Sequence, residues 1–186
     1  WSSDVCSSDL VEDLDAVIAR AQAAGLRRAL VILAADDEPE LKQGGEVAAR
    51  WNDVRFSIGV HPHAAGKYAA DPADAARTVA AAMDAQPLTR ALGEIGLDYH
   101  YDYAPRDVQQ VVFREQIRLA RQRRLPIVIH TREATDDTFR ILGEESAGEV
   151  GVVLHCFTGD REMARRALDA GFYLSLDRKS TRLNSS

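Results

Sequence analysis

The chain has 186 residues and a net charge of −6, and 46% of its residues are hydrophobic while 28% are charged. This length is sufficient for one domain with a hydrophobic core, and the composition is ordinary for a globular protein. The negative charge argues against a protein that coats nucleic acid by bulk electrostatics, but not against an enzyme whose own metal ions supply a local positive field.

Short apolar runs alternate with amphipathic segments from residue 11 to residue 176, which predicts strands alternating with helices. In chain order, the expected helices are 11–25, 37–51, 71–85, 105–124, 133–145 and 160–171, and the expected strands are 29–34, 54–61, 90–99, 126–130, 151–157 and 172–176. Strands separated by helices pair in parallel. A doubly wound sheet and a (β/α)₈ barrel both fit this pattern, and both are α/β folds. The apolar runs are too short to span a bilayer.

The two ends depart from this pattern. Residues 1–10 and 178–186 are serine-rich and lack any apolar period, so we interpret them as non-native tails that flank a domain at 11–177. Native disordered tails are the alternative. The first residues do not show the basic start and following apolar stretch that are typical of a secretory signal. The two cysteines, Cys6 and Cys156, are far apart in sequence and form no disulfide framework, so a cytoplasmic location is expected.

Polar residues lie toward the C-terminal ends of four expected strands. Because side chains alternate across a strand, Glu94 shares a face with Asp98 in one strand, and His61 shares a face with His63 in another. The same alternation places His130 with Arg132, and His155 with Val153. Chemistry in parallel α/β folds gathers at this end of the sheet. Because a ring of polar groups from many strands suits a barrel mouth better than a single switch point, we predict a barrel.

Several histidines and a carboxylate on separate strands are the composition of a metal site, which suits Zn, Mn or Mg. A catalytic metal activates water, and two metals a few ångströms apart stabilise both oxygens of a phosphoester displacement. Any single strand-end histidine is more often a core residue, and Glu94 alone could form a structural ion pair with Arg132 or Arg90. The joint pattern favours the metal. Three neighbouring residues are interpreted separately: Asp98 touches the site or caps a turn, His100 is solvated, and Cys156 faces the core.

Five motifs then resemble the TatD family of metal-dependent hydrolases, in the family's order and spacing. They are 59-GVHPH-63, 92-LGEIGLDY-99, 129-IHTREA-134, 154-LHCFTGD-160 and 171-GFYLS-175. The resemblance implies a TIM barrel, two divalent metal ions (Mg, Mn or Zn) and hydrolysis of phosphodiesters, with DNA as the substrate. It implies that Glu94 is the bridging metal carboxylate and catalytic residue, that His130 and His155 are metal ligands, and that His61, His63 and Arg132 contact substrate. No membrane and no obligate protein partner are expected.

The sequence also departs from the family's pattern. A first strand with an H-x-H pair and a last strand with an aspartate have no counterpart here, so we expect an incomplete barrel that lacks its first and last strands and has impaired activity. Three alternatives are weighed: an amidohydrolase acting on a small cyclic amide, a D-aminoacyl-tRNA deacylase, and a non-catalytic scaffold. The first is disfavoured because such enzymes often carry a carboxylated lysine where this chain has Glu94, and the strand motifs contain no lysine.

Overall fold

A computed structural model describes residues 13–176, and these residues form one parallel six-stranded sheet in the order β1-β2-β3-β4-β5-β6. The strands are β1 (Ala29–Ala34), β2 (Val54–Gly59), β3 (Thr89–Asp98), β4 (Ile127–Arg132), β5 (Val152–Leu154) and β6 (Tyr173–Leu174). Each strand is hydrogen-bonded to the next one along the chain, so the strand order never reverses. A doubly wound sheet requires such a reversal. The sheet is therefore part of a barrel, as the sequence predicted.

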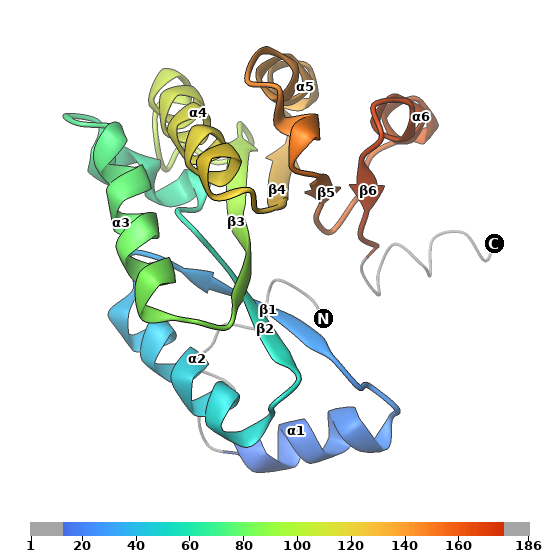
Figure 1. Ribbon diagram of the computed structural model, residues 1–186. Helices are drawn as coiled ribbons and strands as arrows, with labels where there is room; N and C mark the ends of the chain where they lie inside the picture. The colour runs from blue at the N-terminus through green and yellow to red at the C-terminus, as the bar shows by residue number, and fades with distance from the viewer. Residues whose placement is uncertain (1–12, 177–186) are drawn as a thin grey trace.

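The helices lie in an arc along the outer side of the strands (Figure 1). They are α1 (Leu14–Ala23), α2 (Glu38–Arg50), α3 (Ala73–Ala85), α4 (Arg106–Arg123), α5 (Thr135–Glu144) and α6 (Arg161–Asp169). Every predicted helix is present. Two short 3₁₀ helices, η2 (Pro62–Tyr68) and η3 (Ala147–Glu149), were not predicted. The predicted tails, 1–10 and 178–186, fall outside the described residues, and so does the domain's last residue, Asp177.

Aspartate side chains begin three of the helices. Asp13, Asp37 and Asp160 each accept a hydrogen bond from the backbone N–H three residues later, at 3.1, 2.9 and 2.8 Å. Each carboxylate satisfies one of the N–H groups that the first helical turn leaves unpaired, and it also interacts favourably with the helix dipole. These caps set where α1, α2 and α6 begin after their connecting loops.

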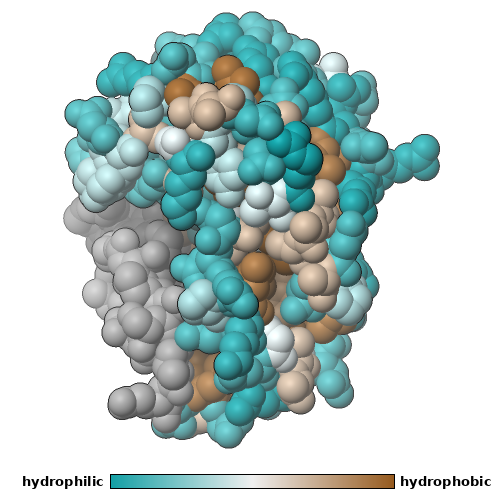
Figure 2. Space-filling model, turned by 90° about the vertical axis from the view of Figure 1, so that its left-hand side faces the viewer, coloured by the Kyte–Doolittle hydropathy of each residue, from teal (hydrophilic) through white to brown (hydrophobic). Residues whose placement is uncertain are grey.

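The hydrophobic core lies between the middle strands and the helices. Phe56, Leu92, Ile95 and Ile129 are fully buried. The outermost strands are less protected: Leu30 on β1 is 50% exposed and Tyr173 on β6 is 69% exposed. On the face shown in Figure 2, the surface is mainly hydrophilic, with a strip of apolar side chains between hydrophilic ridges. Among residues 13–176, no helix combines the length and apolarity needed to cross a membrane.

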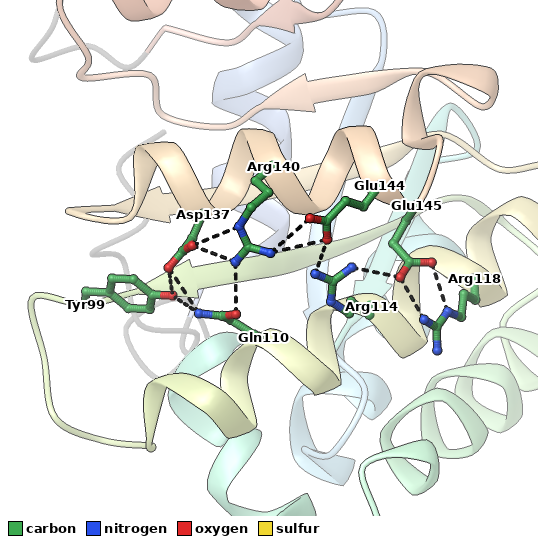
Figure 3. Close-up of polar contacts among 8 residues, drawn as sticks. All are labelled: Tyr99, Gln110, Arg114, Arg118, Asp137, Arg140, Glu144 and Glu145. Atoms are coloured by element: carbon green, nitrogen blue, oxygen red, sulfur yellow. Dashed lines mark hydrogen bonds and ion pairs between the residues drawn. The ribbon is translucent and has the colours of Figure 1, made fainter.

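A chain of polar contacts joins helices α4 and α5 (Figure 3). Glu145 accepts hydrogen bonds from Arg114 at 3.0 Å and from Arg118 at 2.8 and 2.9 Å. At the other end of the chain, the Tyr99 hydroxyl donates to Asp137 at 2.8 Å. Glu145 is only 8% exposed, so its charge is stabilised by two guanidinium groups. These contacts hold α5 against α4 on the outside of the sheet.

Candidate metal centre

The structure gathers polar side chains at the C-terminal ends of the middle strands. Glu94 and Asp98 belong to β3, and His130 belongs to β4. His61 and His63 follow β2, at the start of η2. Because the strands are parallel, their C-terminal ends meet at one edge of the sheet. Of the three residues predicted to converge as metal ligands, Glu94 and His130 are in contact, with His130 Nδ1 3.2 Å from Glu94 Oε1; metal binding by these two and His155 stays a prediction.

Glycines on both sides of Glu94 allow β3 to approach β4 closely. A Cβ atom on Gly96 would overlap the carbonyl oxygen of His130, and one on Gly93 would overlap the carbonyl oxygen of Val128. Both glycines also have positive φ, at 143° and 154°. A side chain at either position would push the strands apart. The glycines of the G-E-I-G stretch therefore set the distance between Glu94 and His130.

The imidazole of His130 lies between two carboxylates. Its Nδ1 faces Glu94, and its Nε2 is 2.9 Å from Asp98 Oδ2. Burial lowers the pKa of His130, but hydrogen bonds and charge from Glu94 and Asp98 outweigh it, so the pKa is raised overall. Burial raises the pKa of Glu94, but the hydrogen bond and charge of His130, followed by the charges of His61 and His155, hold it below its usual value. The site therefore favours an ionised carboxylate at residue 94.

Asp98 both touches the site and caps a turn, so the two interpretations left open by the sequence hold together. Its Oδ2 lies 2.9 Å from Nε2 of His63 and 2.9 Å from Nε2 of His130. Its Oδ1 accepts the backbone N–H groups of His100 at 3.0 Å and Tyr101 at 3.2 Å. Burial raises its pKa, but these donors lower it to about 2. A side chain that is 1% exposed thus stays ionised and orients two histidines.

His61 is a neutral hydrogen-bond donor. Burial, followed by the charge of His130, lowers its pKa to about 4. Its Nδ1 accepts the backbone N–H of His63 at 3.3 Å. The single proton of the neutral ring is therefore on Nε2, which can donate to an anionic oxygen.

His155 lies at the end of β5, beside a cavity of about 220 Å³ that Arg132, Thr135 and Met163 also line. The expectation that Cys156 faces the core is wrong. Its Sγ is 3.2 Å from Nε2 of His155, and both residues line the cavity. The reason is a φ of 43° at Cys156, which breaks the strand alternation on which the expectation was based.

Arg132 ends β4 and His100 follows β3, both at the rim of the site, whereas Arg90 lies at the opposite end of β3. The Arg132 guanidinium lies 4.9 Å above the ring of Tyr101, and Arg90 donates to the backbone carbonyls of Pro87 and Thr89. The recorded ion pair of Glu94 is with His130, so neither arginine is its partner in this structure. His100 is exposed, as expected, and pairs with Glu133 at 2.7 Å.

Two buried glutamines on α4 were missed in the sequence. Gln116 accepts the Val60 N–H at 2.8 Å and donates to the Val60 carbonyl at 3.1 Å, next to His61. Gln109 likewise accepts the Asp98 N–H at 2.8 Å and donates to the Asp98 carbonyl at 2.9 Å. The signal was present: 109 and 116 are two helical turns apart on the apolar stripe that includes Val112. Both side chains position the chain at the strand ends.

The donor set fits a divalent cation. Nitrogen and oxygen groups gather closely enough to surround a bound cation, since ring nitrogens of His61, His63 and His130 lie within 4.8 Å of one another; of these three, His130 is the one that also contacts Glu94. The 3.2 Å between His130 Nδ1 and Glu94 Oε1 is close to the separation of about 3.3 Å between two ligands of a tetrahedral ion with bonds of about 2.0–2.1 Å. Asp98 on the other ring nitrogen of His130 resembles the carboxylate partners that orient metal-binding histidines. Imidazole and carboxylate donors together suit Zn or Mn, among other divalent ions.

Comparisons with known proteins agree with this chemistry. The family described as TatD related DNase matches residues 4–186. The Bacillus subtilis protein named uncharacterized metal-dependent hydrolase YabD is 40% identical over 163 residues, which are 88% of this chain and 62% of that protein. The 3'-5' ssDNA/RNA exonuclease TatD of Klebsiella pneumoniae is 32% identical over 173 residues, 93% of this chain and 64% of that protein.

A solved structure supports the fold. The crystal structure of a TatD family hydrolase from Entamoeba histolytica superposes with a TM-score of 0.78 at 23% identity, covering 89% of this chain and 56% of that chain. This chain therefore spans a little over 60% of the length of the two curated relatives.

Proposed function

This chain belongs to the TatD-related DNase family, and on that premise we propose that it is part of a metal-dependent hydrolase that cleaves phosphodiester bonds in single-stranded nucleic acid. The observation that carries the proposal is His130 held between Glu94 and Asp98, with His61 and His63 beside it. The Klebsiella pneumoniae relative is named as an exonuclease of single-stranded DNA and RNA, which supports a nucleic acid substrate, and we propose DNA.

We propose that Glu94, His130 and His155 are the metal ligands, with Glu94 as the residue on which catalysis depends. When bound, divalent ions would supply an activated water and would neutralise charge on the phosphate. The family resemblance supports two such ions. Glu94 is 13% exposed on its side chain and ionised, so it can hold a cation without first losing a proton.

We assign His61, His63 and Arg132 to the substrate phosphate. The Nε2–H of His61 is a donor in a site that two carboxylates otherwise make negative, so it can receive a phosphate oxygen. Arg132 is exposed at the rim and carries a permanent charge that suits phosphate. His63, fixed by Asp98, lies 4.4 Å from His61 between ring centroids, in an edge-to-face arrangement. The three groups therefore flank the place where a phosphodiester would lie.

The test compares Glu94→Gln with the unchanged chain in Mn²⁺ titration by calorimetry and in cleavage of a labelled single-stranded oligonucleotide. We expect Mn²⁺ affinity to fall at least about tenfold and metal-dependent cleavage to fall further. The melting temperature without metal should change little, because the amide still accepts from His130. Glu162→Gln, an exposed acid at the start of α6, is the matched control and should change neither metal affinity nor cleavage.

A full-length relative such as the B. subtilis protein serves as the reference for turnover. Retention of full metal-dependent cleavage by Glu94→Gln would contradict the proposal. Cleavage of a cyclic amide in place of the oligonucleotide would favour the amidohydrolase alternative. Release of the amino acid from D-aminoacyl-tRNA would favour the deacylase. A large loss of stability on replacing Glu94, with no activity in either form, would favour the scaffold.

A further inference from the structure

The segment that follows β3, 99-YHYDY-103, places two exposed aromatic rings beside the candidate metal centre. Tyr101 is 39% exposed and Tyr103 is 65% exposed. Tyr99 is different, because it is partly buried and its hydroxyl bonds to Asp137. Within residues 13–176, neither the Tyr101 nor the Tyr103 hydroxyl group is hydrogen-bonded to another protein group. Burial and a hydrogen bond therefore account for Tyr99, whereas the two outer rings are held by ring contacts alone and stay open to solvent.

The outer rings continue outward from the site histidines. The ring centroids of His63 and Tyr103 are 4.7 Å apart, and those of Tyr103 and Tyr101 are 5.4 Å apart with planes tilted by 34°. The Arg132 guanidinium lies 4.9 Å above the Tyr101 ring. Tyr101 also contacts His63, with ring centroids 5.5 Å apart, so the two tyrosines and one cation form an aromatic cluster that adjoins the assigned phosphate contact, His63, and is open to solvent.

This arrangement suits a chain with net charge −6, which attracts a polyanion poorly through its overall field. Proteins that bind single strands without sequence preference stack successive bases on exposed aromatic side chains, and each stacked base contributes to affinity whatever its identity. Arginine adds cation–π and phosphate contacts in such grooves. A double-stranded partner would not offer base faces to these rings.

We propose that Tyr101 and Tyr103 form a stacking platform for an unpaired nucleobase of the substrate, and that this platform places the adjacent phosphodiester at His63. The proposal rests on the proposed function. It specifies the substrate as a strand with unpaired bases, and it identifies Tyr103 as the main contact because its ring is the more exposed. The platform accepts any base, since each base has a π face.

The test measures binding of the 186-residue chain to fluorescein-labelled oligothymidine by fluorescence anisotropy. EDTA is present to remove divalent metal ions, so that no strand is cleaved. A second oligonucleotide of equal length carries abasic residues, which keep the phosphates but lack bases. We expect Tyr103→Ala to weaken binding of oligothymidine about 5- to 150-fold, the range measured per stacked base, and to leave binding of the abasic strand unchanged. Tyr103→Trp should retain or improve oligothymidine binding because it keeps a large π face.

Two controls separate stacking from other effects. Val111→Ala removes an apolar side chain that is 43% exposed on α4, and it should leave both affinities unchanged. If Tyr103→Ala lowered the affinity for both oligonucleotides equally, the platform would be overturned. Unchanged affinity of that variant for oligothymidine, or no binding by the unchanged chain, would also overturn it. Cleavage is measured separately with Mn²⁺. Base-dependent binding, together with Mn²⁺ affinity and cleavage that do not change on replacing Glu94 by glutamine, would support the platform while refuting the hydrolase.

Discussion

Replacing Gln116 by leucine tests how the site is held in place. Gln116 is 1% exposed, and its amide satisfies both backbone polar groups of Val60, which is fully buried. Leucine has a similar size but cannot form either hydrogen bond. The Val60 N–H and carbonyl would then be buried without partners, immediately before His61. The perturbation is thus confined to two hydrogen bonds and one strand end.

The magnitude follows from those two groups. A buried polar group left unsatisfied costs about 1–3 kcal/mol, so two groups cost about 2–6 kcal/mol. The added apolar surface of leucine offsets roughly 1–2 kcal/mol of this loss. The midpoints of the two ranges, about 4 and about 1.5 kcal/mol, give an expected fall in the free energy of unfolding of about 2.5 kcal/mol. For a protein of this size the melting temperature should fall by roughly 5–10 °C.

Urea unfolding followed by circular dichroism measures the free energy of unfolding, provided that the transition is two-state. Gln122→Leu is the matched control, because the same substitution is made on the same helix at an exposed position. Its effect should stay within about 0.5 kcal/mol. If Gln116→Leu were also within that margin, the hydrogen bonds to Val60 would not hold the end of β2, and the reasoning would be refuted.

Two further predictions concern the strands and the outer helices. Gly96→Ala should destabilise the chain by more than about 2 kcal/mol and weaken Mn²⁺ binding, because its Cβ would overlap the His130 carbonyl. The control is Gly45→Ala on α2, which has open space around it and should be neutral or stabilising by up to about 1 kcal/mol. Equal melting temperatures for the two variants would contradict this prediction. The pKa of Glu145 is lowered in the folded chain, first by the hydrogen bond from Arg118, so its contribution to stability is complete above its unfolded pKa of about 4.3 and is lost as the pH falls through the folded value. Urea titrations from about pH 7 down to about pH 3 should thus show a smaller loss of stability for Glu145→Gln than for the unchanged chain, and parallel losses would count against the buried pair.

The fold was predictable because its signals are periodic and local. Apolar runs such as the one in β4, separated by amphipathic helices, allow only parallel strands, and polar residues at the ends of several strands favour a barrel. The contact between Glu94 and His130 followed from the same alternation. The predicted metal-ligand and substrate roles of these residues remain predictions that the experiments above test.

Other features of the site depend on contacts that no local pattern encodes. Gln109 and Gln116 interrupt an apolar stripe, but a polar residue in that position does not reveal which backbone group it will satisfy. The position of Cys156 depends on one backbone angle, and strand alternation assumes that such angles do not occur. The η2 helix, which carries His63, begins with a proline and is too short to show a helical period.

Helix α4 connects these features into one mechanical argument. Its inner face holds the end of β2 through Gln116 and the end of β3 through Gln109, while its outer face binds α5 through Arg114 (Figure 3). The two glutamines are two helical turns apart, so the helix fixes the spacing between His61 and Asp98. It does so through backbone groups and does not contact the imidazole of His61 or the carboxylate of Asp98. A change that bends or shifts α4 must therefore move both strand ends together. The stability of the outer helices and the geometry of the metal centre are consequently coupled through α4.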